Sequence, residues 1–391
     1  MKPSDLQFLD EPIESVRHRE RNALEDLLRT RDNRVVLFGC GNLGRQTAKA
    51  LRGIGITPLA FSDNNQARWG SVVDGLEVLP PLEAAETYGK SATFLVTIWN
   101  AQHWYHETFQ QLSGYGAGQV APYVLVHWRF AETFLPFLLN DLPHKLYEER
   151  EAVRSAAGIW GDSLSQSTYQ AGVKMRALGD LSDLPGRPEE NSYFPHDLFD
   201  LDSNDVVLDC GAFDGDTIQQ ALASTNGRIG QLHAIEADSI SFARLREFVN
   251  QLPEGARERV HLHQCGVGLE RGKIHFESSG TIHSKISDQG ELVDSYPIDE
   301  LFRDRPLTLI KMDIEGAEFD ALRGGRKVID RDRPILAICV YHTQNDIWRI
   351  PLLIREMLPE HRLFLRAYEG DGFQTVAYAI PPQRLVARAA A

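Results

Sequence analysis

The sequence predicts an α/β protein built from two Rossmann-like domains. At 391 residues the chain is longer than one ordinary hydrophobic core requires, so two or three domains are expected. Two apolar runs end in glycine-rich loops, V-V-L-F-G-C-G-N-L-G at 35–44 and V-V-L-D-C-G-A-F-D-G at 206–215. Around each loop, apolar strand-like runs alternate with helix-like segments, which is typical of a parallel sheet covered by helices on both faces.

Composition and charge narrow the function classes. The chain carries 55 acidic and 41 basic residues, a formal charge of −14, which disfavours binding to a nucleic-acid backbone. The start has no apolar signal core, and no run approaches the ~18 apolar residues of a membrane helix. The four cysteines lie in strand-like segments without a C-x-x-C pair, as reduced and mostly buried thiols would. We expect a cytoplasmic protein with no membrane or nucleic-acid partner; the oligomeric state stays open, a homo-oligomer included.

The first domain is expected over residues 1–128, with strands at 34–39, 56–63, 92–98 and 121–127. Its loop fits G-x-G-x-x-G, and an acid follows the last glycine by 19 residues, near the spacing for a ribose hydroxyl. This predicts a second nucleotide or dinucleotide site at Gly39, Gly41, Asn42, Gly44 and Asp63. Residues 64–128 show no group that would exchange a hydride. The cluster of Trp99, His103, Trp104 and His106 could line a pocket, but packing is the favoured interpretation.

A helical connector is expected over 129–192, ending in a loop with two prolines and a glycine. The second domain, 193–391, then restarts the alternation. Strands are predicted at 206–209, 231–236, 259–265, 307–313, 334–341, 362–368 and 374–380, and helices at 216–224, 239–251, 316–323 and 346–357. The last two strands are joined by a connection too short for a parallel crossover, so they should form an antiparallel hairpin. Seven strands with an antiparallel terminal hairpin match the plan of class I S-adenosylmethionine (SAM) methyltransferases.

The second glycine loop fits D-x-G-x-x-x-G, in which an acid precedes the first glycine and can reach the cationic amino-acid end of SAM. Glycines let the backbone approach the cofactor, and polar groups at the helix start can bind its carboxylate. An acid at the end of the next strand is placed to accept hydrogen bonds from ribose hydroxyls, and the third strand end lies near the adenine. The predicted cofactor residues are Asp209, Gly211, Asp214, Gly215, Thr217, Glu236, Gln264, Cys265 and Asp313. Each piece alone could also be an ordinary strand-to-helix turn.

Ionisable residues follow the fourth and fifth strands of this domain, in I-K-M-D-I-E-G-A-E and C-V-Y-H. Ligands of open α/β sheets bind beyond the carboxyl ends of the strands, so Asp313, Glu315 and His342 are predicted to be catalytic. A strand-end histidine suits a general base that removes a hydroxyl proton. Alternatively His342 only makes hydrogen bonds, while Asp313 and Glu315 cap the next helix and pair with Lys311. A divalent metal on the three residues is conceivable, but the spacing does not require one, so none is predicted.

These motifs carry a family resemblance over about 193–381. Y-F-P-H-D-L-F (193–199), V-V-L-D-C-G-A-F-D-G-D-T (206–217), I-E-A-D (235–238), I-D-E-L (298–301), I-K-M-D-I-E-G-A-E (310–318) and R-P-I-L-A-I-C-V-Y-H (333–342) resemble the FkbM family of SAM-dependent methyltransferases. The resemblance implies O-methylation of sugar or natural-product hydroxyls. By the same resemblance Ser284 and Lys285 fall in a loop that borders the active site, and we place them with the strand-end Tyr341 at the substrate. Gln264-Cys265-Gly266 departs from the asparagine that relatives often have there, which leaves the adenine contact open.

The first domain resembles nucleotide-binding domains fused to glycan-modifying enzymes. Two hypotheses therefore remain from the sequence. One is a SAM-dependent O-methyltransferase with an accessory front domain. The other is an NAD(P)-dependent oxidoreductase or epimerase that uses the first glycine loop.

Overall fold

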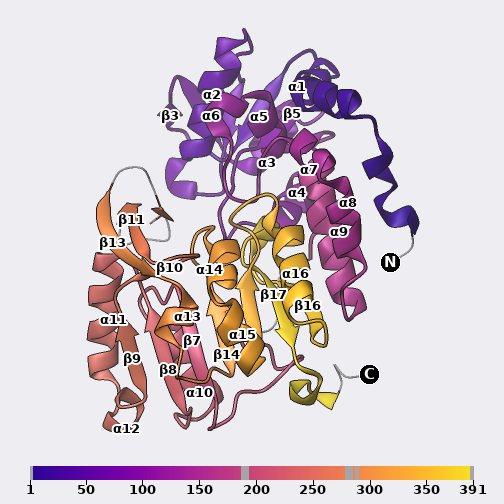
Figure 1. Cartoon of the computed structure of the whole chain (residues 1–391). Coiled ribbons are helices and arrows are strands. Elements are labelled where there is room, and N and C mark those ends of the chain that lie inside the picture. Colours follow the sequence, from indigo (N-terminus) through magenta and orange to yellow (C-terminus); the bar gives the residue numbers. More distant parts are fainter. Residues whose placement is uncertain (1–2, 186–192, 278–284, 287–289, 388–391) are drawn as a thin grey trace. The chain divides into compact units, whose positions relative to one another are not determined.

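The computed structural model describes residues 3–185, 193–277, 285–286 and 290–387 (Figure 1). The chain divides into two compact units, each with its own sheet. The first unit comprises Met1–Arg154, Ser167–Pro188 and Ala367–Phe373, and the second comprises Ser155–Gln166, Glu189–Arg366 and Gln374–Ala391. The α/β class with two Rossmann-like sheets is confirmed, whereas the predicted divisions after residues 128 and 192 stay predictions.

The first unit contains a six-stranded sheet of order β3-β4-β2-β1-β5-β6. Its strands are β1 (Val35–Phe38), β2 (Ala60–Ser62), β3 (Val72–Val73), β4 (Leu76–Leu79), β5 (Thr93–Val96) and β6 (Val120–Pro122). All neighbours are parallel except β3 and β4. The early helices are α1 (Ile13–Arg29), α2 (Asn42–Gly53), α3 (Pro81–Tyr88) and α4 (Tyr105–Gly114). The strands β1 and β5 are buried along their whole length, as expected for central parallel strands.

The helical segment predicted after residue 128 begins earlier in the structure. Its helices are α5 (Val124–Arg129), α6 (Ala131–Phe134), α7 (Pro143–Glu148), α8 (Arg150–Ala157) and α9 (Ser163–Leu178). The predicted strand at 121–127 is therefore wrong beyond Pro122. A short apolar run does not distinguish a strand from a buried helix, and proline lacks the N–H that a continuing strand would donate.

The second unit contains a seven-stranded sheet of order β16-β17-β15-β14-β7-β8-β9 (Figure 1). The strands are β7 (Val206–Cys210), β8 (Gln231–Ile235), β9 (Val260–His263), β14 (Leu309–Met312), β15 (Ile335–Cys339), β16 (Arg362–Ala367) and β17 (Thr375–Ile380). Five neighbouring strands of this sheet are parallel, namely β9, β8, β7, β14 and β15. The strand β17 runs antiparallel to β15 and lies next to β16. The seven predicted strands all exist, within a few residues of their predicted bounds.

Helices connect these strands. They are α10 (Asp216–Ser224), α11 (Ser239–Gln251), α12 (Glu254–Arg257), α13 (Ile298–Leu301), α14 (Glu318–Gly324), α15 (Arg326–Asp332) and α16 (Asp346–Met357). A further sheet of order β10-β13-β11-β12, which the sequence interpretation did not include, lies between β9 and β14 in the chain. It consists of β10 (Gly266–Val267), β11 (Gly272–Glu277), β12 (Lys285–Ile286) and β13 (Glu291–Tyr296).

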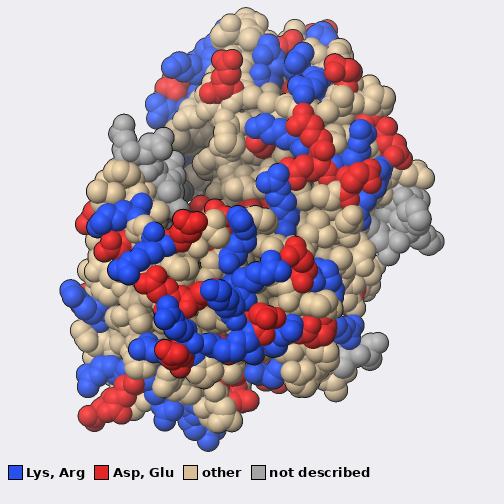
Figure 2. Space-filling model, in the orientation of Figure 1, with Lys and Arg blue, Asp and Glu red and all other residues tan. Residues whose placement is uncertain are grey.

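All four cysteines are buried free thiols, as predicted. None of the helices in the described ranges combines the length and apolar character that a membrane crossing needs. Figure 2 shows Lys and Arg interspersed with Asp and Glu over the face drawn, so the net negative charge is not segregated into one patch there.

Candidate active site

The site lies where the parallel strands β7, β8, β14 and β15 end. Asp209 of β7 pairs in register with Lys311 of β14, and Lys311 pairs with Ala337 of β15. The carboxyl ends of these strands therefore meet at one edge of the sheet, where ligands of open α/β sheets bind. The loops that follow β7, β14 and β15 bring the predicted residues together there.

Two glycines of the loop after β7 cannot be replaced without strain. Gly211 has φ +81°, and a Cβ on it would lie 1.9 Å from the Asp313 carbonyl oxygen. Gly215 has φ +102°, and a Cβ there would lie 2.5 Å from the Phe248 ring. Only glycine combines this backbone conformation with such close approach. The loop after β7 is thus packed directly onto the loop after β14.

Asp209 lies behind the glycine loop. It is fully buried, and one carboxylate oxygen lies 2.8 Å from Lys311 Nζ, which also donates to the Gly211 carbonyl oxygen at 2.7 Å. Burial raises the pKa of Asp209 to about 6 despite the opposing effect of Lys311. Lys311 thus pairs with Asp209, and not with Asp313 and Glu315 as the alternative interpretation held. The predicted contact of Asp209 with the cofactor stays a prediction.

Glu236 connects the end of β8 to the glycine loop. Its carboxylate accepts hydrogen bonds from the Phe213 N–H at 2.8 Å and the Asp238 N–H at 2.7 Å. Burial raises its pKa to about 7, and these two amides act in the opposite direction. Each oxygen keeps a further lone pair for a ribose hydroxyl. Of the other predicted cofactor residues, Thr217 and Cys265 are buried, whereas Asp214 and Gln264 are exposed.

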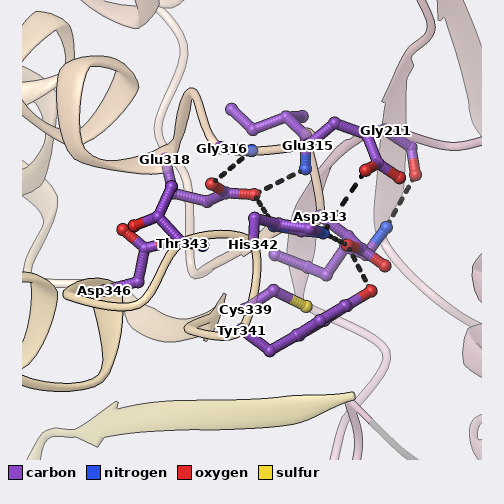
Figure 3. Close-up of polar contacts among 12 residues, drawn as sticks. Gly211, Asp313, Glu315, Gly316, Glu318, Cys339, Tyr341, His342, Thr343 and Asp346 are labelled. Atoms are coloured by element: carbon purple, nitrogen blue, oxygen red, sulfur yellow. Dashed lines mark hydrogen bonds and ion pairs between the residues drawn. The ribbon is translucent and has the colours of Figure 1, made fainter. Parts of the chain in front are cut away.

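His342, directly after Tyr341 beyond β15, lies among three carboxylates (Figure 3). Its Nε2 is 3.1 Å from Asp313 Oδ1 and 3.9 Å from Glu315 Oε2, and its Nδ1 is 2.8 Å from Glu318 Oε1. The side chain is buried, and neither nitrogen meets the angular requirement of a hydrogen bond to a described residue. Burial opposes the charge of the ring, but Glu318 and Asp313 outweigh this effect and raise the pKa of His342 well above its ordinary value.

The Asp313 carboxylate accepts hydrogen bonds from two tyrosine hydroxyls. Tyr193 donates to Oδ2 at 2.7 Å, and Tyr341 donates to Oδ1 at 3.2 Å. Burial opposes ionisation, but His342, Lys311 and Tyr193 outweigh this effect and lower the pKa of Asp313. Sequence reasoning did not single out Tyr193, whose only signal was its place at the start of Y-F-P-H-D-L-F. The structure therefore adds a buried phenol to the predicted set.

The loop after β14 has an unusual backbone. Glu315 has φ +56°, a left-handed conformation that non-glycine residues adopt rarely and that clusters at functional sites. Glu318 holds this turn, because its carboxylate accepts from the Ile314 N–H at 2.7 Å and the Gly316 N–H at 3.0 Å. Burial raises the pKa of Glu315 to about 7. Glu318, rather than Asp313 or Glu315, therefore satisfies the backbone at the start of α14.

Of the three predicted substrate residues, the structure describes the side chain of Tyr341 alone. Ser284 lies outside the described residues, and nothing is described of the Lys285 side chain in β12. Tyr341 is part of the cluster through its hydrogen bond to Asp313.

The N-terminal glycine loop has the backbone geometry that its G-x-G-x-x-G motif predicts. A Cβ on Gly44 would lie 1.9 Å from the Gly39 carbonyl oxygen, whereas Gly41 faces open space and Asn42 is exposed. Asp63 accepts from the Cys40 N–H at 3.0 Å and from the Asn65 N–H at 2.8 Å. A ligand of this loop stays a prediction.

The aromatic cluster near the N-terminal sheet is packed. Trp99 stacks on Tyr123 with ring centroids 5.1 Å apart and contacts Phe137 and Phe373 edge-on or tilted. Trp104 is buried, and His103 lies 3.5 Å from Asp371. These contacts agree with the packing interpretation for Trp99, His103 and Trp104, whereas His106 is exposed.

Comparisons with known proteins address the second unit and the overall fold. Residues 209–371 match the family model described as the methyltransferase FkbM domain. A solved structure of methyltransferase FkbM from Methylobacillus flagellatus KT is similar at a TM-score of 0.73 and 22% identity, covering 91% of this chain and 92% of that one. An rRNA methylase from Streptococcus thermophilus matches at a TM-score of 0.30 and 14% identity, over 46% of this chain and 89% of its own. Among curated proteins, none matches the chain.

The family match spans the glycine loop, Glu236 and the cluster around His342, which are the features that the sequence and the structure single out in the second unit. The structural similarity extends the same fold over most of the chain. Residues 209–371 of this chain are therefore similar to the methyltransferase FkbM domain, and most of the chain shares the fold of a solved FkbM methyltransferase.

Proposed function

We propose that this protein is a methyltransferase of the FkbM family that uses SAM to methylate a hydroxyl group of a sugar or small natural product. The observation that carries the proposal is the meeting, at one sheet edge, of a glycine loop, a strand-end acid and the Asp313–Glu315–His342 cluster. The first two fit the nucleoside of SAM, and the cluster fits a hydroxyl that must lose its proton.

The residues present fit SAM in shape and charge. Gly211 and Gly215 carry no side chain that could obstruct a cofactor beside this loop. Glu236 keeps acceptor capacity beyond its two amide hydrogen bonds. Burial raises the pKa of Asp209, Glu236 and Glu315, and neighbouring carboxylates raise each of them further, so negative charge is in surplus at this edge. A cofactor with a sulfonium and an ammonium group complements such a surplus.

The reaction is a displacement at carbon. SAM supplies a methyl group activated on a sulfonium: the acceptor oxygen forms the new O–C bond while the S–C bond breaks and its electron pair stays on sulfur. The protein holds the acceptor in line, and the Asp313–Glu315–His342 cluster promotes loss of the hydroxyl proton. Both nitrogens of His342 already face carboxylates, so the cluster acts as a unit rather than through a free imidazole.

Calorimetry on the full chain tests the cofactor. We expect micromolar affinity for S-adenosylhomocysteine and SAM, followed by methyl transfer to hydroxyls in a screen of sugars and small molecules. Micromolar affinity for NAD(H) without any response to SAM would contradict the proposal and favour the oxidoreductase hypothesis.

A further inference from the structure

We propose that Asp313, Glu315 and His342 bind one divalent transition-metal ion, and that Glu318 orients the imidazole from behind. The described residues contain one group with the compactness of a metal site, in which ligand atoms of Asp313, Glu318 and His342 lie within 4.8 Å of one another. The contacts around the ring show how these carboxylates divide between the two nitrogens.

The Nε2 side has the spacing of a first coordination sphere. Asp313 Oδ1 lies 3.1 Å from His342 Nε2, and Glu315 Oε2 lies 3.9 Å from the same nitrogen. Neighbouring ligands about 2.1 Å from an octahedral ion are ~3.0 Å apart, and opposite ligands are ~4.2 Å apart. Both observed distances fall in this range. Side-chain exposures of 21% for Asp313 and 29% for Glu315 leave this side open to an entering ion.

On the Nδ1 side a carboxylate lies within hydrogen-bonding distance, at the place where a metal-bound histidine needs one. A ligating imidazole almost always donates its other N–H to a carboxylate or carbonyl, which fixes the ring orientation. Glu318 Oε1 lies 2.8 Å from Nδ1, and the Glu318 side chain is fully buried. Its carboxylate is already held by two backbone N–H groups of the loop that carries Glu315. Glu318 therefore fits the role of the carboxylate that orients the ring, and Glu315 fits that of a metal ligand on the Nε2 side. This holds although Glu318, and not Glu315, belongs to the compact group of ligand atoms with Asp313 and His342.

The buried ring itself is the second indication of an ion. His342 is 6% exposed, yet neither nitrogen has a hydrogen bond of proper geometry to a described residue. Nε2 points toward the two most exposed carboxylates of the cluster (Figure 3). One imidazole with two carboxylates suits Mn²⁺, Fe²⁺ or Zn²⁺, because an all-oxygen set would be expected for Mg²⁺ or Ca²⁺.

This inference deepens the proposed function, on which the role of the ion rests. A bound cation that accepts a lone pair of the acceptor hydroxyl lowers the pKa of that hydroxyl. The proton leaves to water, and the resulting alkoxide forms the O–C bond as the S–C electron pair stays on sulfur. The binding of the ion itself requires neither SAM nor acceptor.

The experiment uses the full chain after treatment with a chelator and dialysis, with Mn²⁺ as the probe. Electron paramagnetic resonance counts free Mn²⁺ during a titration, and spin-echo spectra detect nitrogen coupling from a ligating imidazole. We expect one Mn²⁺ per chain with nitrogen coupling, and at least tenfold weaker binding in Asp313→Asn and Glu315→Gln. Glu318→Gln should weaken binding ~10–100-fold although it leaves the ligands in place.

Asp320→Asn is the matched control, because this carboxylate lies exposed on the same helix as Glu318 and pairs only with Arg323 among the contacts described. No binding below ~1 mM Mn²⁺, or equal affinity in Glu315→Gln and Asp320→Asn, would overturn the proposal. Calorimetry with S-adenosylhomocysteine on the same samples separates the two ideas. Cofactor binding without Mn²⁺ binding rejects only the metal site, whereas Mn²⁺ binding without cofactor binding supports the metal site and rejects the proposed function.

Discussion

The two glycine loops of this chain share the same backbone scaffold but differ in the side chains that the neighbouring strands place beside them. In each unit the first loop glycine donates to the last residue of the next strand, Gly39 to Ser62 and Gly211 to Ile235. In each, the acid after that strand accepts a loop N–H and the N–H two residues on. A glycine loop with a strand-end acid is thus a structural device of the fold and does not by itself locate the chemistry.

The difference lies on the other side of the first strand, at the ends of β5 and β14. Thr97 follows β5 and Asp313 follows β14, and both donate their backbone N–H to the carbonyl at the end of the first strand. The Thr97 hydroxyl turns back to the Phe38 and Gly39 carbonyl oxygens and is buried. Asp313 instead faces His342 and two tyrosines. Equivalent positions on one scaffold therefore serve packing in the first unit and present ionisable groups in the second.

Removing the imidazole of His342 should have the largest effect on activity. We expect His342→Ala to lower methyl-transfer turnover ~10²–10⁴-fold, because the acceptor hydroxyl loses its activation. Affinity for S-adenosylhomocysteine should change less than ~3-fold, since the glycine loop and Glu236 remain. Steady-state kinetics and calorimetry give the two values. His196→Ala, which removes an exposed histidine, is the control. Unchanged turnover would remove His342 from the mechanism.

The next largest effect is expected from a substitution in the glycine loop after β7, which changes the free energy of unfolding. Gly211→Ala forces a left-handed alanine against the Asp313 carbonyl oxygen, so we expect a loss of more than about 3 kcal/mol in the free energy of unfolding. Gly227→Ala is the matched control, because its φ of +74° is also left-handed but no atom lies within 4 Å of the added Cβ. It should lose only about 1 kcal/mol. Equal losses in urea unfolding would show that the contact with Asp313 does not restrict the loop.

The strands and the glycine loops were predictable because they depend on local pattern. Apolar runs ending in glycine fix β1 and β7, and an acid at the end of the next strand follows from the same alternation. The partners of the site were less predictable, because they depend on contacts between distant segments. Tyr193 reaches Asp313 across 120 positions of sequence, and nothing in its own segment reveals this hydrogen bond. Similarly, the pairing of Asp209 with Lys311 depends on the register of two separate strands.

Some misses had a local signal. The unpredicted hairpin of β3 and β4 turns at Asp74-Gly75, both with positive φ, which is the Asp-Gly pattern of a tight hairpin turn. The strand predicted at 121–127 failed because an apolar run of this length fits a buried helix equally well.

A smaller effect concerns pH and cofactor affinity. Burial raises the pKa of Glu236 to about 7, so its carboxyl group is largely neutral at pH 6 and largely ionised at pH 8. The ionised form accepts ribose hydroxyls better, so affinity for S-adenosylhomocysteine should rise as the pH increases through 7. We expect Glu236→Gln to weaken binding about tenfold at pH 8 and to flatten this rise. Calorimetry at several pH values checks both. An equal pH dependence in the variant would assign the titration to another group.

The smallest effect tests whether the equivalent acid of the first unit is only structural. Asp63→Asn leaves one oxygen acceptor but removes the charge that the Cys40 and Asn65 N–H groups stabilise, so we expect a loss of about 1 kcal/mol in the free energy of unfolding. Affinity for S-adenosylhomocysteine and turnover should remain at their original values, because the equivalent oxygen atoms of the cofactor site belong to Glu236. Urea unfolding and calorimetry on the same preparation provide the measurements. A fall in turnover with unchanged stability would contradict the conclusion that the first glycine loop has no part in the reaction. That conclusion depends on Thr97, whose buried hydroxyl donates to the Phe38 and Gly39 carbonyl oxygens and so faces no ligand site.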